Sequence, residues 1–263
     1  MKYNLSTIYR SLLFVLLGFT ILSFQIFSAT AQPMGKMNMD TSFMKQKDMP
    51  DMQNQTMLPM SFFTHMGMPL EVGTYGIRVA AVSTQNEGKS NIEYNFQLET
   101  GLSKTVGLFI GGEGLFEHPT LEAMVQFLVL KSKDGMSGFS PLIEFEFPLG
   151  KDAARSVYTL VGFATTLSTS DLAFNQVLHY SPLEDLIEGS ASFVFKLTEK
   201  IFLVSEISGV GQSGERPILN LLGGVKVKLM ENFFLGAAFQ LPITNNREYS
   251  SRYVFQPNIM FNQ

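Results

Sequence analysis

Alternation of apolar and polar side chains with a period of two is the feature that most limits what this chain can fold into. It is clearest in SNIEYNFQLETGL, residues 90–102. One face of this stretch is polar, and the other carries Ile92, Tyr94, Phe96, Leu98 and Leu102. Such a period predicts a β-strand, because successive side chains of a strand point to opposite faces. The pattern returns in SPLIEFEFPLG, SASFVFKL and RYVFQPNIMF.

Breaks between the alternating runs divide the chain after residue 72 into twelve predicted strands. They recur roughly every 16 residues, the spacing expected for strands of about 9–11 residues and their turns in a transmembrane β-barrel. We place the breaks at residues 85–90, 103–105, 117–120, 131–137, 149–155, 168–171, 181–187, 198–200, 211–217, 230–232 and 243–250. The sequence therefore predicts an all-β fold, an antiparallel up-and-down transmembrane β-barrel of about 12 strands.

Alternate breaks differ in length, as the periplasmic turns and outer loops of such barrels do. The breaks at 103–105, 168–171, 198–200 and 230–232 are short, and the one at 131–137 is the exception in its set. The other set is longer and more charged, as in ITNNREYSS. A soluble β-sandwich or lipocalin-like barrel also alternates and is the alternative. A charged fraction of only 16%, with 24 Phe and 8 Tyr, favours the membrane barrel.

The first 31 residues have the three parts of a secretory signal peptide. Lys2 and Arg10 give a positive start, residues 11–24 form an apolar core, and the small-x-small sequence ATA precedes Gln32. An uncleaved membrane anchor is the alternative, but the apolar run is shorter than the roughly 20 residues of a spanning helix. We expect cleavage before Gln32.

The rest of the chain divides into two predicted regions. Residues 32–62 are polar, rich in methionine and interrupted by three prolines. Their few other apolar side chains cannot offset the entropy cost of ordering the chain, so we interpret them as a disordered periplasmic arm. Residues 63–263 form the predicted barrel. The stretch SFFTHMGMPL, residues 61–70, is expected to dock the arm to the barrel.

Ten of the 15 methionines of the chain lie between residues 34 and 68. Thioether sulfur is a soft ligand that selects Cu(I) and Ag(I), and nearby aspartates could add hard ligands for Cu(II). Short spacings let two or three sulfurs surround one ion without a fold. The predicted metal ligands are Met34, Met37, Met39, Met49, Met52, Met57, Met60, His65, Met66 and Met68. The alternatives are a disordered spacer, a sacrificial oxidant, or an adaptable surface for partner proteins.

The interior of a twelve-stranded barrel can hold a narrow channel or one small molecule. Its inward face is predicted to carry Arg78, Glu93, Glu99, Glu113, Glu122, Glu144, Glu146, Glu206, Lys226 and Lys228. These charges either line a path or pair across the lumen and close it. His179 is expected near the outer end of a strand, facing lipid headgroups or a loop.

Several classes of function are disfavoured. The chain has no cysteine, which excludes a disulfide framework and thiolate metal sites. Its net charge of −4 gives no basic surface for nucleic acid. No HExxH, P-loop or GxSxG motif is present, and the Glu144–Glu146 pair alone is weak support for catalysis. We therefore predict that the protein is not an enzyme.

Several stretches of the chain resemble a known family. The stretch beginning SFFTHMGMPLEVGTYGIRV resembles the opening of the outer-membrane barrel family named for the meta-pathway of phenol degradation. ETGLSKTVGL, FKLTEKIFL and VKLMENFFL resemble its repeated Y-x-L-T-x-x-L periplasmic turn, and SPLIEFEFPLG resembles its mid-barrel strand. The resemblance covers residues 61–263 and implies an outer-membrane transporter or channel. Many barrels end on an aromatic residue, whereas here Phe261 is followed by two polar residues.

Three functional hypotheses remain open. The first is an outer-membrane transporter or channel for small solutes, with an arm that binds copper or another soft metal ion. The second is a barrel for uptake or export of small apolar or aromatic compounds, with the arm as a spacer. The third is a structural barrel with a plugged lumen. The expected partners are outer-membrane lipid, small solutes or metal ions, and the barrel-assembly machinery. Both termini are expected in the periplasm.

Overall fold

The computed structural model describes residues 58–115, 119–149, 157–247 and 249–262. The predicted signal peptide and most of the predicted arm lie outside the described residues. The strands are β1 (Thr74–Asn86), β2 (Lys89–Gly101), β3 (Val106–Glu113), β4 (Thr120–Phe127), β5 (Leu130–Lys131), β6 (Gly138–Pro148), β7 (Tyr158–Ser168), β8 (Leu172–Ser181), β9 (Leu186–Lys196), β10 (Ile201–Gln212), β11 (Ile218–Met230), β12 (Phe233–Pro242) and β13 (Ser251–Asn262). Within the described ranges, no helix is long and apolar enough to cross a membrane.

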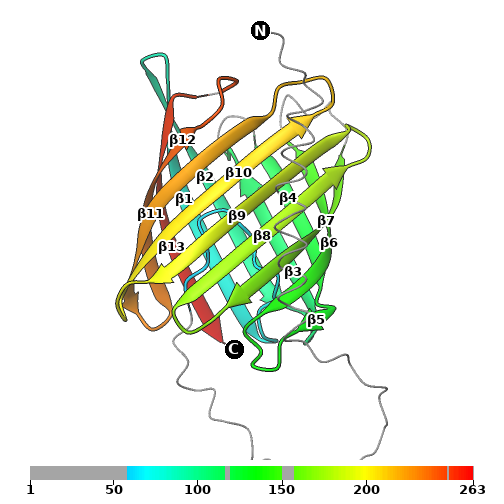
Figure 1. Cartoon of the computed structure of the whole chain (residues 1–263), viewed down its shortest axis with the longest axis vertical. Helices are drawn as coiled ribbons and strands as arrows, with labels where there is room; N and C mark the ends of the chain where they lie inside the picture. The colour runs from blue at the N-terminus through cyan, green and yellow to red at the C-terminus, as the bar shows by residue number, and fades with distance from the viewer. Residues whose placement is uncertain (1–57, 116–118, 150–156, 248, 263) are drawn as a thin grey trace, which may run out of the picture.

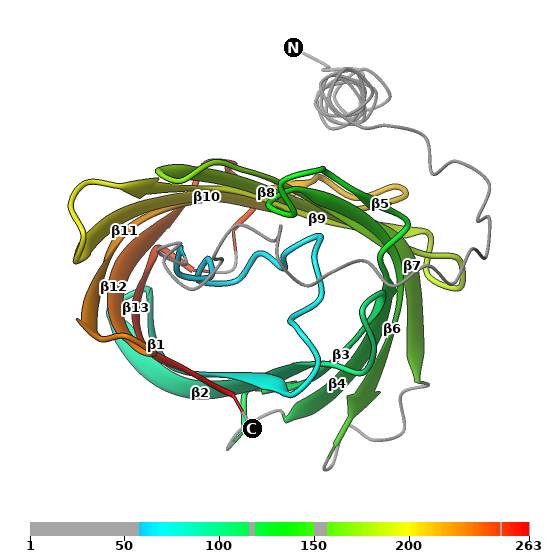
Figure 2. The ribbon, with the colours of Figure 1, turned by 90° about the horizontal axis from the view of Figure 1, so that it is seen from below.

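The strands form one closed antiparallel ring. Consecutive strands pair with each other, except that β5 is a two-residue fragment that follows β4, and both pair with β6. β1 and β13 pair from Thr74↔Asn262 to Gln85↔Ser251, which closes the sheet. With β4 and β5 counted as one interrupted strand, the ring in Figure 2 has twelve strands. The predicted up-and-down barrel is confirmed.

The two faces of the sheet differ in polarity, as the alternation predicts. On β6, Ile143 and Phe145 point outward and are each 40% exposed, whereas the inward Glu144 is 4% exposed. Directly opposite residues share a face, so the strand registers carry this division around the ring. Other exposed outward side chains are Ile92, Tyr94, Val161, Phe193, Phe195, Leu203, Ile207, Leu221, Val225, Phe239, Tyr253 and Phe255. An apolar outer surface around a polar interior is the arrangement of a barrel that spans a membrane.

The two ends of the barrel differ in the length of their connections. The end that we name the short-turn end has turns at 102–105, 132–137, 169–171, 197–200 and 231–232. The opposite end, the loop end, has connections at 87–88, 114–119, 149–157, 182–185, 213–217 and 243–250. The tight turn at the loop end is made by Glu87 and Gly88, which both have positive φ, as a two-residue hairpin requires.

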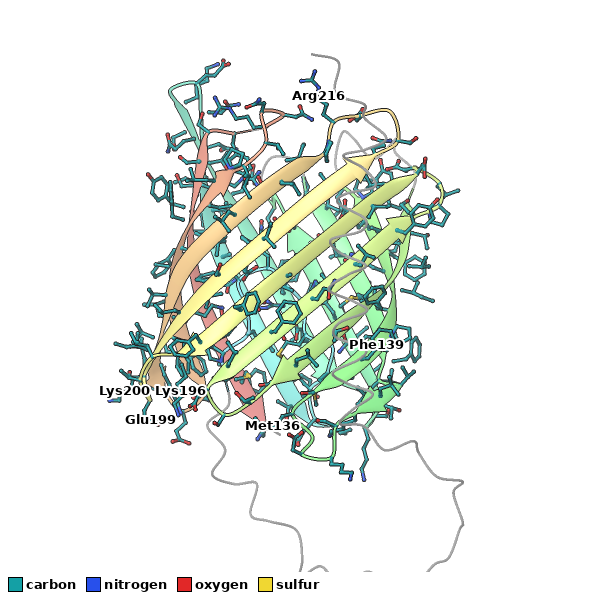
Figure 3. The ribbon with its side chains drawn as sticks, viewed as in Figure 1. Met136, Phe139, Lys196, Glu199, Lys200 and Arg216 are labelled. Atoms are coloured by element: carbon teal, nitrogen blue, oxygen red, sulfur yellow. The ribbon has the colours of Figure 1, made fainter. Side chains whose placement is uncertain are left out.

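Charged side chains mark the two ends. Figure 3 shows Lys196, Glu199 and Lys200 at the short-turn end and Arg216 at the loop end, with Phe139 on the wall between. β1, the first strand of the ring, begins at the short-turn end, and β13, the last strand, ends there (Figure 1).

Residues 58–70, which we name the lumenal segment, lie inside the ring (Figure 2). None of them belongs to a strand. Phe62 is fully buried and belongs to an apolar cluster with inward side chains of seven strands, which include Ala80, Val82, Phe202, Val204, Leu222, Phe234 and Val254. The sequence assigns residues 58–62 to the arm. The structure places them in the lumen, because the wall offers Phe62 an apolar site.

Candidate functional site

Glu206 of β10 binds the backbone of the lumenal segment. Its carboxylate accepts hydrogen bonds from the backbone N–H groups of Phe62, Phe63 and Thr64, the last two at 3.1 and 3.2 Å. The Thr64 hydroxyl donates to the same carboxylate at 3.2 Å. Glu206 is only 3% exposed. The three consecutive N–H donors therefore replace water as hydrogen-bond partners of the buried Glu206 carboxylate. The segment is held through its backbone.

Lys226 of β11 holds the same stretch from its carbonyl side. Its Nζ donates to the carbonyl oxygens of Met60 and Ser61 at 2.7 and 2.9 Å, and to Gln256 Oε1 at 2.9 Å. Gln256 in turn donates to the carbonyl oxygen of Phe62 at 2.8 Å. The Lys226 ammonium also lies 4.4 Å from the centre of the Phe62 ring, a cation–π distance. All three donors of this fully buried ammonium have acceptors.

Arg78 of β1 and Glu99 of β2 form an ion pair beside the lumenal segment. Arg78 Nη1 also donates to the carbonyl oxygen of Ser61 at 3.3 Å. On the segment, His65 Nδ1 lies 3.8 Å from Glu99 Oε1, and the His65 ring meets Phe109 edge-on with ring centres 4.5 Å apart. This pair joins two adjacent wall strands to both halves of the segment.

The far side of the lumen binds the segment at Gly67. Its N–H donates to Thr166 Oγ1 of β7 at 2.8 Å, and its carbonyl oxygen accepts from Ser140 Oγ of β6 at 2.8 Å. A side chain here would not fit, because a Cβ would stand about 2.5 Å from the Thr165 backbone. The lumenal segment thus crosses from the β10–β11 wall to the β6–β7 wall, in the half of the barrel nearer the short-turn end.

A further anchor is a hydroxyl cluster around Ser61. Its Oγ lies 2.5 Å from Ser192 Oγ of β9, and Asn175 Nδ2 of β8 donates to it at 3.2 Å. Thr166 Oγ1 donates to Asn175 Oδ1 at 2.8 Å, which links this anchor to the one at Gly67. The segment is therefore bonded to strands on every side of the lumen.

The strand registers place all ten predicted lumen residues on the inward face. Four of them, Arg78, Glu99, Glu206 and Lys226, surround the lumenal segment. The others do not contact it in any hydrogen bond or ion pair of the described residues: Glu93, Glu113, Glu122, Glu144, Glu146 and Lys228. Sequence reasoning missed Gln256, Ser140 and Asn175, because uncharged polar residues on an inward face carry no signal of their own.

The expected facing of His179 toward lipid headgroups or a loop is wrong. It lies on the inward face of β8 directly opposite Glu188, and its Nδ1 is 3.3 Å from Glu144 Oε2. Only 9% of its side chain is exposed. The face on which His179 lies depends on the register of β8 against its neighbouring strands. The sequence pattern near this strand did not determine that register.

Four of the ten predicted metal ligands belong to the described residues. Met60 is buried, Met68 packs near Gly138, and His65 and Met66 line a small pocket with Met124 of the wall. The remaining six lie outside the described residues: Met34, Met37, Met39, Met49, Met52 and Met57. The described part of the chain has no group of three or more His, Cys, Asp or Glu that could hold a metal ion. The soft-metal site stays a prediction.

Comparison with known proteins connects this chain to solved outer-membrane barrels through structure alone. No protein-family model matches it, and no curated protein matches its sequence. The KdgM porin is similar with a TM-score of 0.57 at 8% identity, over 71% of this chain and 99% of that one. The NanC porin has a TM-score of 0.51 at 8% identity, over 72% and 99%. An outer-membrane channel from Pseudomonas putida F1 has 0.51 at 10% identity, over 74% and 97%.

These three structures are porins and channels, not enzymes. At such low identity the likeness establishes the fold, the closed antiparallel barrel of outer-membrane proteins. The resemblance to the phenol meta-pathway family stays a prediction, since no family model matches the chain.

Proposed function

We propose that this protein is an outer-membrane channel or transporter for small solutes whose lumen is closed by its own lumenal segment. The proposal is supported by the porin-like fold and by the polar inward face. The observation that carries it is the way in which the segment is held. No strand pairing joins it to the wall, and its anchors are side chains such as Glu206, Lys226 and Arg78.

Attachment through side chains, without strand pairing, allows the lumenal segment to leave the lumen while the barrel stays intact. Charged and polar wall groups can exchange their bonds with the segment for bonds with water when the lumen fills. Hydrogen bonds that are exchanged for water in this way change the free energy only modestly each. The apolar contacts of Phe62 then favour the closed state. We infer that the short-turn end faces the periplasm and that the segment leaves the lumen toward that side.

Removing the lumenal segment is the direct test. We expect a deletion of residues 58–68 to raise the ion conductance of the barrel in planar bilayers on the order of tenfold or more, because the narrowest part of the path loses its filling. The control deletes residues 34–44, which shortens the chain equally and leaves the segment in place. If both deletions conduct no better than the full chain, the transport proposal is wrong.

A structural barrel with a closed lumen is the second candidate. It is favoured by the burial of Arg78 and Lys226, which are 2% and 0% exposed and both donate to carbonyl oxygens of the segment. A deletion that remains folded but does not conduct would support this reading. Heat-dependent migration in gels and circular dichroism would report whether the deleted barrel is folded.

We further propose that the methionine-rich arm binds Cu(I) or another soft ion near the periplasmic mouth. Replacing Met34, Met37, Met39, Met49 and Met52 with isoleucine is expected to weaken Cu(I) binding to the full chain at least tenfold, since isoleucine has no sulfur ligand. Competition with a chromogenic Cu(I) chelator measures the affinity. Met230→Ile, at an exposed position of the short-turn end, is the control. Equal affinity in all variants would reduce the arm to a spacer.

A further inference from the structure

Five glutamates line the lumen between the lumenal segment and the loop end, and we name them the acidic vestibule: Glu113 of β3, Glu122 of β4, Glu144 and Glu146 of β6, and Glu188 of β9. Glu122 lies directly opposite Glu146 in the strand register. It is also within electrostatic range of the other four carboxylates. Like charges on neighbouring inward positions repel each other, so this wall favours a positively charged occupant.

His179 of β8 gives the vestibule an unpaired nitrogen. Its Nδ1 faces the Glu144 carboxylate at 3.3 Å, and Glu188 is its direct neighbour in the register. The buried Nε2 has no hydrogen-bond partner in the described part of the chain. When Nδ1–H of a neutral imidazole points to a carboxylate, Nε2 carries the lone pair and requires a donor. This nitrogen is a second observation, independent of the glutamates, that indicates a ligand.

The described residues supply little positive charge to this wall. Glu122, Glu146 and Glu188 take part in no hydrogen bond or ion pair among them. Arg252 of β13 is within electrostatic range of Glu113. Its guanidinium, however, lies over the Tyr249 ring at 3.9 Å and donates to Thr84 Oγ1 at 3.2 Å. The vestibule therefore keeps at least three carboxylates available to a ligand.

The spacing of the carboxylates selects the class of cation. No three His, Asp or Glu among the described residues converge closely enough to hold a metal ion. The acidic side chains are instead distributed over four strands. A flexible molecule with several separated charges can reach more of them than a single ion can. Each ammonium group brings three donors, which suit both carboxylate oxygens and the free imidazole nitrogen.

We propose that the acidic vestibule binds a linear organic cation with two or more ammonium groups. One ammonium donates to His179 Nε2 beside Glu144, and others pair with Glu122, Glu146 and Glu188. This goes beyond the proposed transport and does not depend on it. The ligand enters from the loop end, so it binds whether or not the lumenal segment ever moves.

Spermine is the probe that tests the site, by isothermal titration calorimetry of the full-length protein in detergent. We expect saturable binding that weakens about tenfold, equivalent to about 1.4 kcal/mol, in Glu122→Gln/Glu146→Gln. His179→Ala is expected to weaken it as well, although it leaves the charge unchanged. The control is Glu199→Gln/Glu231→Gln, the same charge change at exposed positions of the short-turn end, which is expected to bind as the unmodified chain does. Heat-dependent gel migration confirms that each variant is folded.

Two results would overturn the proposal. The first is no spermine binding to the unmodified protein, or binding that the control pair weakens as much as the vestibule pair does. The second is binding of Zn²⁺ that requires His179 while spermine does not bind, which would make this a metal site. Because conductance is not measured, neither of these results bears on the transport proposal.

Discussion

The double variant Ser61→Cys/Ser192→Cys is expected to close the barrel under oxidising conditions and to open it again when a reductant is added. The two hydroxyl oxygens lie 2.5 Å apart, so cysteines at these positions are close to the roughly 2.05 Å of a sulfur–sulfur bond. The chain has no other cysteine, which removes competing pairings. Solute flux into proteoliposomes, with and without reductant, measures the effect.

The size of this effect depends on how completely the cross-link forms. An intact disulfide is a covalent bond of about 2.05 Å, so residues 61 and 192 cannot separate until it is reduced. If opening requires the lumenal segment to leave the wall at Ser61, solute flux in the oxidised variant falls to that of the fraction that remains unoxidised. Ser83→Cys/Ser90→Cys is the matched control, because these hydroxyls are 3.4 Å apart on β1 and β2 and do not touch the segment. Equal solute flux with and without reductant in both variants would mean that the segment does not gate the path.

The barrel could be predicted from the sequence because the local alternation of apolar and polar residues determines which face of the sheet each side chain takes. Ile143, Glu144 and Phe145 each take the face that a period of two assigns, and the predicted breaks fall at the observed turns, including the longer one at 132–137. Strand pairing between sequence neighbours adds no long-range unknown except the closure of β1 on β13. The inward positions followed from the same rule, which is why the charged residues of the lumen could be named.

The lumenal segment could not be predicted in the same way, because its structure depends on residues far away in the chain. Residues 58–70 have no period of their own. Phe62 fits because Gly224 and Gly236, far later in the chain, have no side chains: a Cβ on either would stand 2.7 or 2.8 Å from the Phe62 ring. The partners of Glu206 and Lys226 were also missed, because they are mainly backbone N–H and C=O groups of this segment. Such groups occur in almost every residue, so the sequence does not indicate which of them bind a side chain.

Glu206→Ala is expected to release the lumenal segment more than any other single substitution. It removes the acceptor of three backbone N–H groups and of the Thr64 hydroxyl, and these donors stay buried without partners while the segment is in place. Breaking a buried charged interaction from one side costs about 3–5 kcal/mol. Here that cost falls on the closed state alone, because water replaces the lost acceptor once the segment leaves.

The consequence is a rise of roughly 10²- to 5 × 10³-fold in the equilibrium for segment opening. Hydrogen exchange of the amides of Phe62, Phe63 and Thr64 measures that equilibrium directly, since protection of an amide reports the free energy of the opening that exposes it. Glu93→Gln is the matched control, because Glu93 faces the same lumen but, among the described residues, is hydrogen-bonded only to the neighbouring Asn91 side chain. Unchanged protection of the three amides in Glu206→Ala, in a barrel whose strand amides remain protected, would show that the segment is held by its apolar contacts instead. The polar anchors would then set its position and not its release.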